Sequence, residues 1–184
     1  IDKTPIDKIN LNDLRSNIGY VPQEVFLFSE TIANNISFGL TGVNVSKKTI
    51  EEAAKNAAIY RNIIEFPDQF ETFVGERGIT LSGGQKQRIS IARAIIRTPQ
   101  ILIFDDCLSS VDIETEEEIL RNLKIIMQDK TSIIISHRVS SVKHADHIII
   151  LDEGKVIEEG KHSFLIDKKG LYFDLFQKQQ LENS

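Results

Sequence analysis

Two acidic side chains follow an apolar run in the middle of the sequence. Ile101 to Phe104 are four consecutive apolar residues, and Asp105 and Asp106 come directly after them. A continuous apolar run is typical of a parallel strand buried on both faces, and ligands bind at the carboxyl ends of such strands. Carboxylates at that place could hold Mg²⁺. A strand that simply ends in a polar loop would give the same pattern, so this motif alone is not specific.

A glycine pair opens a helical pattern at residues 81–85, which read Leu-Ser-Gly-Gly-Gln. Gly83 and Gly84 would let backbone N–H groups approach an oxyanion closely, and the positive end of the following helix would point toward it. The Ser82 hydroxyl could add a hydrogen bond to a phosphate oxygen. The alternative is a turn followed by an ordinary helix N-cap, in which Ser82 is only structural.

Two further polar residues stand at the ends of apolar runs. His137 follows the run Ile133 to Ile135 and Ser136, and Gln23 follows Val21 and a proline. Each of these residues taken alone is more often structural than functional.

Apolar periodicity places these residues on alternating strands and helices. We expect strands at 18–22, 101–104, 132–135 and 147–151, a brief strand at 72–74, and a hairpin turn at 152–155. We expect the strands 132–135 and 147–151 to be buried. Helices are expected at 31–38, 47–58 with Ser46 as the N-cap, 61–66, from 83 or 84 to 97, 114–127, and 171–180. This alternation predicts an α/β fold with a mainly parallel sheet core, interrupted by a helical subdomain.

Composition excludes several classes of protein. The chain has 184 residues, 41% hydrophobic and 27% charged, which is typical of a folded domain. Its net charge of -5 argues against a nucleic-acid binder that works through bulk positive charge. The single cysteine excludes an internal disulfide framework. The chain opens at Ile1 rather than Met, so we expect it to be a piece of a longer protein.

The motifs, taken in order along the chain, resemble the nucleotide-binding domain of ATP-binding cassette (ABC) transporters. The resemblance rests on residues 20–23, 81–85, 101–106, 109–112 and His137, and it covers nearly the whole chain. It implies a P-loop NTPase-like fold with a helical signature subdomain at about 30–98 and a core at about 99–184. Residues 72–78 look like the X-loop of ABC exporters, which favours an exporter over an importer.

The same resemblance implies a role for each site residue, with ATP and Mg²⁺ as cofactors. The implied nucleotide contacts are Gln23 of the Q-loop, Ser82, Gly83, Gly84 and Gln85 of the signature, and Asp112 of the D-loop. Asp105 would be the Walker B aspartate that holds Mg²⁺ together with Gln23, Asp106 would stand at the position of the catalytic base, and His137 would be the switch histidine that contacts the γ-phosphate.

The sequence departs from the family pattern in two ways. It has no Walker A motif, since the Gly-Lys pairs at 154–155 and 160–161 are not followed by Ser or Thr. We therefore expect the P-loop upstream of Ile1, and we expect the chain alone neither to bind ATP tightly nor to hydrolyse it. Second, Asp106 stands where the family usually has a glutamate, and its side chain is one methylene shorter.

The resemblance implies a head-to-tail pair of nucleotide-binding domains at the cytoplasmic face of a membrane, with a transmembrane domain upstream in the same chain. The shorter Asp106 favours a heterodimer in which this chain provides the degenerate site, and a homodimer with a slow Asp106 is the alternative. Two other classes stay open: a non-catalytic ABC-type interaction domain, and a soluble ABC ATPase of DNA maintenance. The compact segment between Gln23 and Leu81 has no sustained heptads and argues against the latter.

Overall fold

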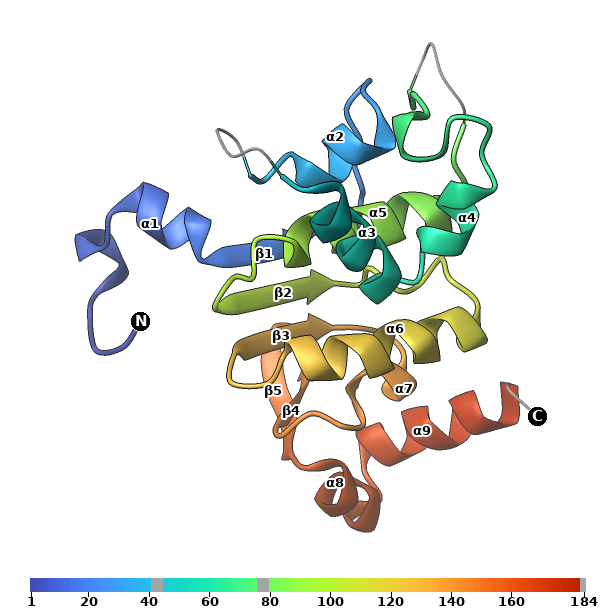
Figure 1. The fold of residues 1–184 in the computed structure, drawn as a ribbon. Helices are drawn as coiled ribbons and strands as arrows, with labels where there is room; N and C mark the ends of the chain where they lie inside the picture. The colour runs from blue at the N-terminus through green and yellow to red at the C-terminus, as the bar shows by residue number, and fades with distance from the viewer. Residues whose placement is uncertain (41–44, 76–79, 183–184) are drawn as a thin grey trace. The chain divides into compact units, whose positions relative to one another are not determined.

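The computed structural model describes residues 1–40, 45–75 and 80–182. These residues form two compact units, 1–133 and 134–184. Figure 1 shows the course of the chain, and each unit is described by itself. Residues 41–44, which the sequence pattern indicates as a loop between the helices predicted at 31–38 and 47–58, lie outside the described residues, as do residues 76–78 of the expected X-loop.

The first unit contains the parallel strands that carry the acidic residues. Strand β1 (Ile18–Val21) pairs with β2 (Ile101–Asp105) in parallel, with Tyr20 opposite Ile103 and Val21 opposite Phe104. The strand order is β1-β2-β3, and β3 (Thr131–Ile135) crosses the boundary between the units. Since strands far apart in sequence pair in parallel with helices between them, the predicted α/β fold is confirmed.

The helices in the described part of this unit are α1 (Leu11–Ser16), α2 (Ile32–Ser37), α3 (Lys47–Asn56), α4 (Tyr60–Ile64), α5 (Gly83–Ile95) and α6 (Ile113–Ile126), with short 3₁₀ turns η1 (Ile6–Lys8) and η2 (Gln69–Glu71). Five of these α-helices, α1, α2, α3, α5 and α6, begin at a residue whose side chain accepts a backbone N–H of the first turn. The Ser46 side chain accepts the backbone N–H of Thr49 at the start of α3, as predicted.

Helix α5 forms the centre of the first unit. Ile89, Ala92, Ile95 and Ile96 recur at the spacing that predicts an apolar stripe on this helix, and all four are buried. Ile91 is also fully buried, because α5 packs against α2 and α3 as well as β1. The helix that carries the glycine pair is therefore fixed from several sides (Figure 1).

The second unit is a hairpin followed by two helices. It holds α7 (Val139–Val142), β4 (Ile148–Asp152), β5 (Lys155–Gly160), α8 (His162–Lys168) and α9 (Leu171–Glu182). The two residues of the hairpin turn, Glu153 and Gly154, have φ of 46° and 74°, the left-handed conformation that a tight antiparallel hairpin requires. The core of this unit is Val139, Ile148, Leu165 and Tyr172.

The predictions of buried strands at 132–135 and 147–151 were wrong. Ile133 and Ile135 are 47% and 50% exposed, and Ile149 and Leu151 are 52% and 67% exposed. Side chains alternate between the faces of a strand, and among the described residues only one face of β3 and β4 is packed. The strand expected at 72–74 is reduced to an isolated bridge between Thr31 and Phe73.

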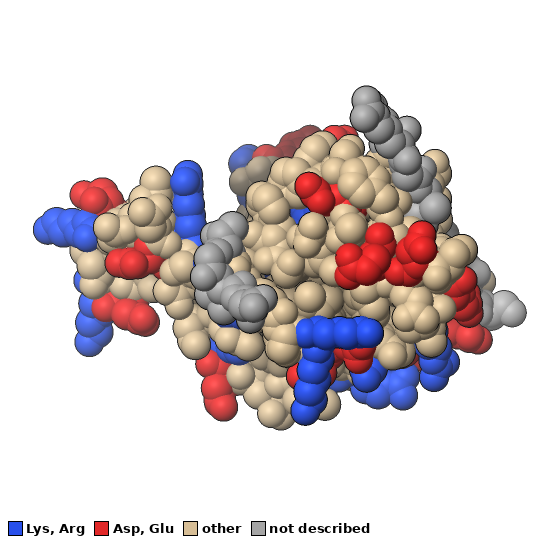
Figure 2. All heavy atoms as spheres, turned by 45° about the horizontal axis from the view of Figure 1, so that its top comes forward, with Lys and Arg blue, Asp and Glu red and all other residues tan. Residues whose placement is uncertain are grey.

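Figure 2 shows both basic and acidic side chains on one face of the molecule, and neither sign covers that face alone. None of the helices in the described part of the chain is long and apolar enough to cross a membrane.

Candidate nucleotide site

Gln23, Asp105 and Asp106 lie together where β1 and β2 end. The two strands are parallel, so their carboxyl ends meet at one edge of the sheet. The Gln23 side-chain Nε2 donates to Asp106 Oδ2 at 3.4 Å, across 83 residues of sequence. The structure therefore brings Gln23 together with the two acidic residues, which the sequence places on a separate motif.

Tyr20 is a member of this group that sequence reasoning did not assign to the site. Its phenol donates to Asp105 Oδ2 at 3.1 Å, and this bond to a carboxylate is the main reason that the pKa of Tyr20 is raised. The contact follows from the register of β1 against β2, which the sequence alone does not give. Tyr20 pairs with Ile103, two residues before Asp105, so Tyr20 and Asp105 are on the same face of the sheet.

Asp106 begins a turn that leaves the sheet. Its φ of 42° is left-handed, a conformation that Asp tolerates better than most residues. The Asp106 carbonyl accepts the Ser109 hydroxyl at 2.9 Å, and the next residue, Cys107, is buried. Burial raises the pKa of the Cys107 thiol to about 12. The carboxylate of Asp106 is thus presented from a turn that is anchored in the core.

The signature residues form a reciprocal helix cap. Ser82 Oγ accepts the backbone N–H of Gln85 at 3.2 Å, and Gln85 Oε1 accepts the backbone N–H of Ser82 at 2.9 Å. Ser82 therefore acts as a helix N-cap in this fold. This role is compatible with a hydrogen bond from Ser82 to a phosphate oxygen, because a hydroxyl that accepts a hydrogen bond can still donate its own proton.

The two glycines have different surroundings. A Cβ built at Gly84 would lie 2.9 Å from the backbone oxygen of Ser110, whereas at Gly83 the nearest atom is Ser110 Cβ at 3.7 Å. Gln87 of the same helix, buried among its neighbours, accepts the Ser110 backbone N–H at 3.3 Å. Packing among the described residues thus favours a glycine at 84, and it leaves room for a side chain at 83.

Asp112 has a structural role in this chain. Its carboxylate caps α6 by accepting the Thr115 backbone N–H at 2.9 Å, and this bond lowers the pKa of Asp112. The nearby Arg88 guanidinium lowers it further. Arg88 also donates to the carbonyl of Ala58 and to Asn62, which ties α5 to α4.

The segment after Gln23 is fixed by two polar side chains. Arg93 donates to the Phe26 carbonyl at 2.9 Å and to both oxygens of Asn35 at 2.8 Å. Asn35, fully buried, in turn accepts the Phe28 N–H and donates to the Phe28 carbonyl. Phe28 stacks on Phe38 with ring centroids 4.0 Å apart.

His137 belongs to the second unit and lies two residues after the end of β3. Its side chain is exposed, and its backbone carbonyl accepts Gln179 Nε2 at 2.7 Å. The preceding Ser136 accepts the Arg138 N–H through its hydroxyl at 2.9 Å. The histidine is therefore presented from a turn with several side-chain contacts to its backbone.

The carboxylates at the end of β2 fit a Mg²⁺ ion of the kind that nucleotides carry. Among the residues that the structure describes, no group of three or more His, Cys, Asp or Glu side chains could hold a metal by itself. Mg²⁺ usually binds through only one or two carboxylates together with phosphate oxygens and water. Asp105 with Gln23 suits that partial role, and the phosphates would supply the rest.

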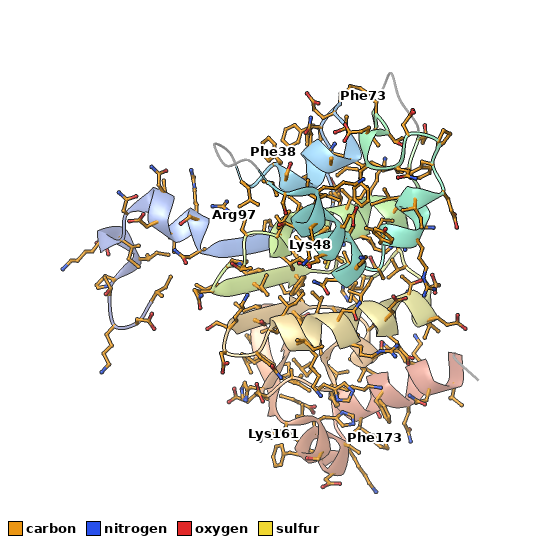
Figure 3. All side chains as sticks on the ribbon, in the orientation of Figure 1. Phe38, Lys48, Phe73, Arg97, Lys161 and Phe173 are labelled. Atoms are coloured by element: carbon orange, nitrogen blue, oxygen red, sulfur yellow. The ribbon has the colours of Figure 1, made fainter. Side chains whose placement is uncertain are left out.

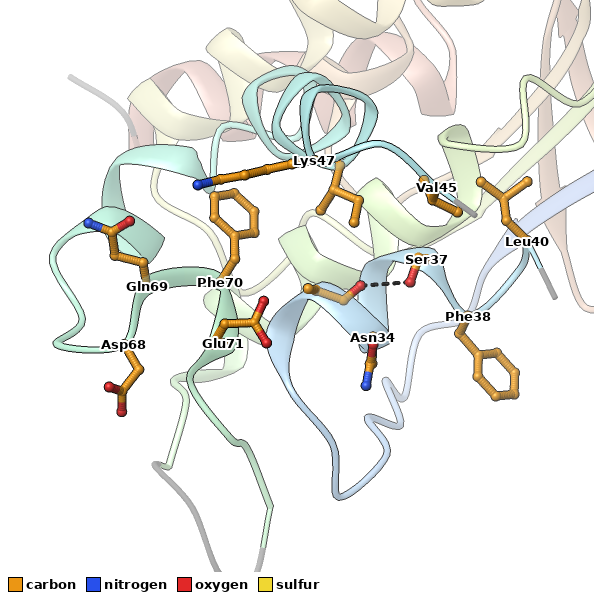
Figure 4. Close-up of a pocket in the computed structure, with 12 residues that line it drawn as sticks. Asn34, Ser37, Phe38, Leu40, Val45, Lys47, Asp68, Gln69, Phe70 and Glu71 are labelled. Atoms are coloured by element: carbon orange, nitrogen blue, oxygen red, sulfur yellow. Dashed lines mark hydrogen bonds between the residues drawn. The ribbon is translucent and has the colours of Figure 1, made fainter. Parts of the chain in front are cut away.

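A pocket of about 610 Å³ lies elsewhere in the first unit, among α2, α3 and η2. Figure 4 shows its lining, with Lys47 above Phe70, the acidic side chains Asp68 and Glu71, and a hydrogen bond from the Ser37 hydroxyl. None of the predicted nucleotide residues lines it, so it carries no argument for nucleotide binding.

The sequence profile of the ABC transporter family matches residues 1–109, more than half of the chain. The chain belongs to the ABC transporter family. It is 49% identical over 179 residues to the uncharacterized ABC transporter ATP-binding protein YknU of Bacillus subtilis, covering 97% of this chain and 30% of that protein. It is 45% identical over 178 residues to the multidrug resistance-like ATP-binding protein MdlA of Escherichia coli, again 97% of this chain and 30% of the relative.

A solved structure shows the same fold. The chain superposes on a bacterial Atm1-family ABC exporter with ATP bound, with a TM-score of 0.91 and 39% identity, over 98% of this chain and 31% of that one. This ABC domain is thus of the ATP-binding, exporter type, and its P-loop NTPase-like fold is confirmed. The chain spans about a third or less of the length of these relatives.

Proposed function

We propose that this ABC domain binds and hydrolyses ATP in the full-length protein and thereby drives export of a substrate across a membrane. The observation that carries the proposal is the grouping of Gln23, Asp105 and Asp106 at one edge of the sheet. In the proposed reaction Asp105 holds Mg²⁺, and Gln23 lies near the metal and the attacking water. His137 contacts the γ-phosphate.

The signature residues act on a second nucleotide in this proposal. Two ABC domains pair head to tail, and the N-terminus of α5 meets the ATP that the partner domain holds. Ser82 donates a hydrogen bond to the γ-phosphate, and the Gly83 and Gly84 backbone approaches it closely. Gln85 and Asp112 contribute to the same interface. The room beside Gly83 supports this, because packing among the residues that the structure describes gives no reason for a glycine there.

We further propose that the partner is a different chain and that this chain provides the degenerate site. The support is the length of Asp106, whose carboxylate is held back relative to a glutamate and also accepts Gln23 Nε2. A misplacement of ~1 Å at a catalytic group can cost about 100-fold in rate. A homodimer with slow hydrolysis at Asp106 is the competing arrangement.

The aromatic surface beside the Q-loop is proposed to receive the transmembrane domain of the same protein. Phe26 is 67% exposed and Phe38 is 50% exposed, their ring centroids lie 5.2 and 4.0 Å from that of Phe28, and Figure 3 shows Phe38 on the helical segment of the first unit. Arg93 holds the backbone at Phe26 in place. This proposal puts the domain at the cytoplasmic face of a membrane. It also gives the isolated chain, which has no Walker A motif, little affinity for ATP and no turnover.

The test compares two variants of the full-length protein, paired with its partner in membrane vesicles. Gly83→Asp places a bulky anion where the partner's ATP must approach, and we expect it to abolish ATP turnover. Asp106→Ala removes a base that contributes little, and we expect turnover to fall less than about 5-fold. Both variants are checked for folding by thermal denaturation.

The results separate the arrangements. If Asp106→Ala lowers turnover by more than about 100-fold, Asp106 is a true catalytic base and the homodimer replaces the degenerate-site arrangement. If neither variant changes turnover, the ATPase assignment itself is wrong.

A further inference from the structure

The side-chain amide of Gln179 bridges two backbone groups beside His137. Its Nε2 donates to the His137 carbonyl at 2.7 Å, and its Oε1 accepts the Val139 N–H at 2.7 Å. Gln179 lies on α9, about forty residues further along the chain, and both contacts fall within the second unit. One rigid amide group therefore spans the peptide groups on both sides of Arg138.

These bonds satisfy a need of the local backbone. Val139 is the first residue of α7, and the first N–H groups of a helix have no partner within it. The residue at the N-cap, Arg138, makes no side-chain capping bond, and Gln179 supplies the missing acceptor from another helix. With the Ser136 hydroxyl accepting the Arg138 N–H, side chains bind three polar backbone groups of the two peptide units that follow His137.

Gln179 is itself presented by an anchored helix. The buried Glu158 carboxylate accepts the backbone N–H groups of Leu171 and Tyr172 at 3.0 and 3.2 Å, at the start of α9. Tyr172 is 1% exposed and donates or accepts a hydrogen bond with His162 Nδ1. Gln179 lies seven residues after Tyr172, about two helical turns, so the two residues share one face of α9.

We propose that Gln179 is a positioning residue for His137. In this proposal Gln179 contacts neither the nucleotide nor the metal. It fixes the peptide groups on both sides of Arg138, and the backbone there determines where the His137 side chain starts and which way it points. It also makes the placement of α9 a determinant of the ATP step. The proposal rests on the proposed function, in which His137 contacts the γ-phosphate.

The experiment measures ATP turnover of the full-length protein with four changes. Gln179→Ala removes both bonds. Gln179→Glu keeps an acceptor for the Val139 N–H but cannot donate to the His137 carbonyl. Gln177→Ala, at an exposed position of the same helix, is the matched control. His137→Ala provides the background in which a positioning role should disappear.

We expect Gln179→Ala to lower kcat about 5- to 10-fold and to leave KM for ATP within about twofold, because a positioning residue contributes to the transition state more than to binding. Gln179→Glu should lower kcat similarly, and Gln177→Ala should leave it unchanged. In the His137→Ala background, Gln179→Ala should cost less than about twofold more. Hydrogen exchange of the Val139 amide should speed up in Gln179→Ala and stay slow in Gln179→Glu.

The outcomes distinguish the two proposals. If His137→Ala itself leaves turnover unchanged, the proposed role of His137 fails, and the role of Gln179 fails with it. If His137→Ala is damaging but Gln179→Ala is silent, or lowers kcat by the same factor in both backgrounds, only the inference about Gln179 is overturned. Unchanged exchange of the Val139 amide in Gln179→Ala would overturn it as well.

Discussion

A methyl group added at Gly84 tests whether the signature helix is held as closely to the following loop as the structure shows. The new Cβ would lie 2.9 Å from the Ser110 backbone oxygen and 3.3 Å from Val111 Cγ1. The obstructing oxygen cannot rotate away, because Gln87 binds the same peptide segment through the Ser110 N–H and Val111 is buried.

The expected size of the effect follows from two opposing terms. Overpacking of this kind costs about 1–3 kcal/mol. Replacing a helical glycine with alanine returns roughly 0.5–1 kcal/mol through the reduced entropy of the unfolded chain. Taking the middle of each range, about 2 kcal/mol lost and about 0.75 kcal/mol returned, we expect Gly84→Ala to lower the free energy of unfolding by about 1.3 kcal/mol. For a chain of this size that corresponds to a fall in Tm of about 3–5 °C.

The control is Gly83→Ala in the neighbouring position of the same helix. Its Cβ would meet Ser110 Cβ at 3.7 Å, an ordinary contact, so stability should stay the same or rise slightly. The assay is thermal and urea denaturation of the two variants and the parent, followed by circular dichroism. Equal melting of Gly84→Ala and the parent, or an equal loss in Gly83→Ala, would show that the close contact with Ser110 does not exist.

Two further predictions concern the first unit. Arg93 donates two hydrogen bonds to Asn35 and one to the Phe26 carbonyl, and the ammonium group of Arg93→Lys cannot reproduce all three. We expect this variant to lose about 1–3 kcal/mol of unfolding free energy, measured by urea denaturation. An unchanged denaturation midpoint would contradict the role of Arg93. Cys107 is buried, and burial raises the pKa of its thiol to about 12, far above pH 8. We therefore expect iodoacetamide to alkylate Cys107 about 100-fold more slowly in the native protein than in urea. Rapid labelling of the native protein would show that the turn after Asp106 opens readily.

Features that depend on nearby residues could be predicted from the sequence. Ser46 caps α3 as expected, because a cap joins residues three positions apart, and the stripe on α5 follows from helical periodicity. The end of β2 was also predictable, since a buried strand followed by acids is a local pattern. The short helices α2 and α4 were expected at 31–38 and 61–66, whereas α1 and α7, with six and four residues, were not predicted.

Features that depend on distant contacts could not be predicted. A run of isoleucines gives strand propensity, but Ile133 and Ile135 are buried only if something covers their face. The bond between Tyr20 and Asp105 joins residues 85 positions apart, and it required the register of β1 against β2. Gln179 looks like any polar residue of an amphipathic helix until the fold places its amide against residues 137 and 139.

The contact at Gly84 restricts how this sequence can change over time. The atom in its way belongs to the main chain, which every amino acid carries, so no exchange of the Ser110 side chain can make space for a larger residue at position 84. A larger residue at 84 would need a shift of the backbone at 110, and that shift would leave the buried side-chain amide of Gln87 without its hydrogen bond to the Ser110 N–H. A library that randomises positions 83, 84 and 110 and selects for folding alone should therefore return glycine at 84 whatever occupies 110, while position 83 drifts. Only selection for function would bring glycine back at 83.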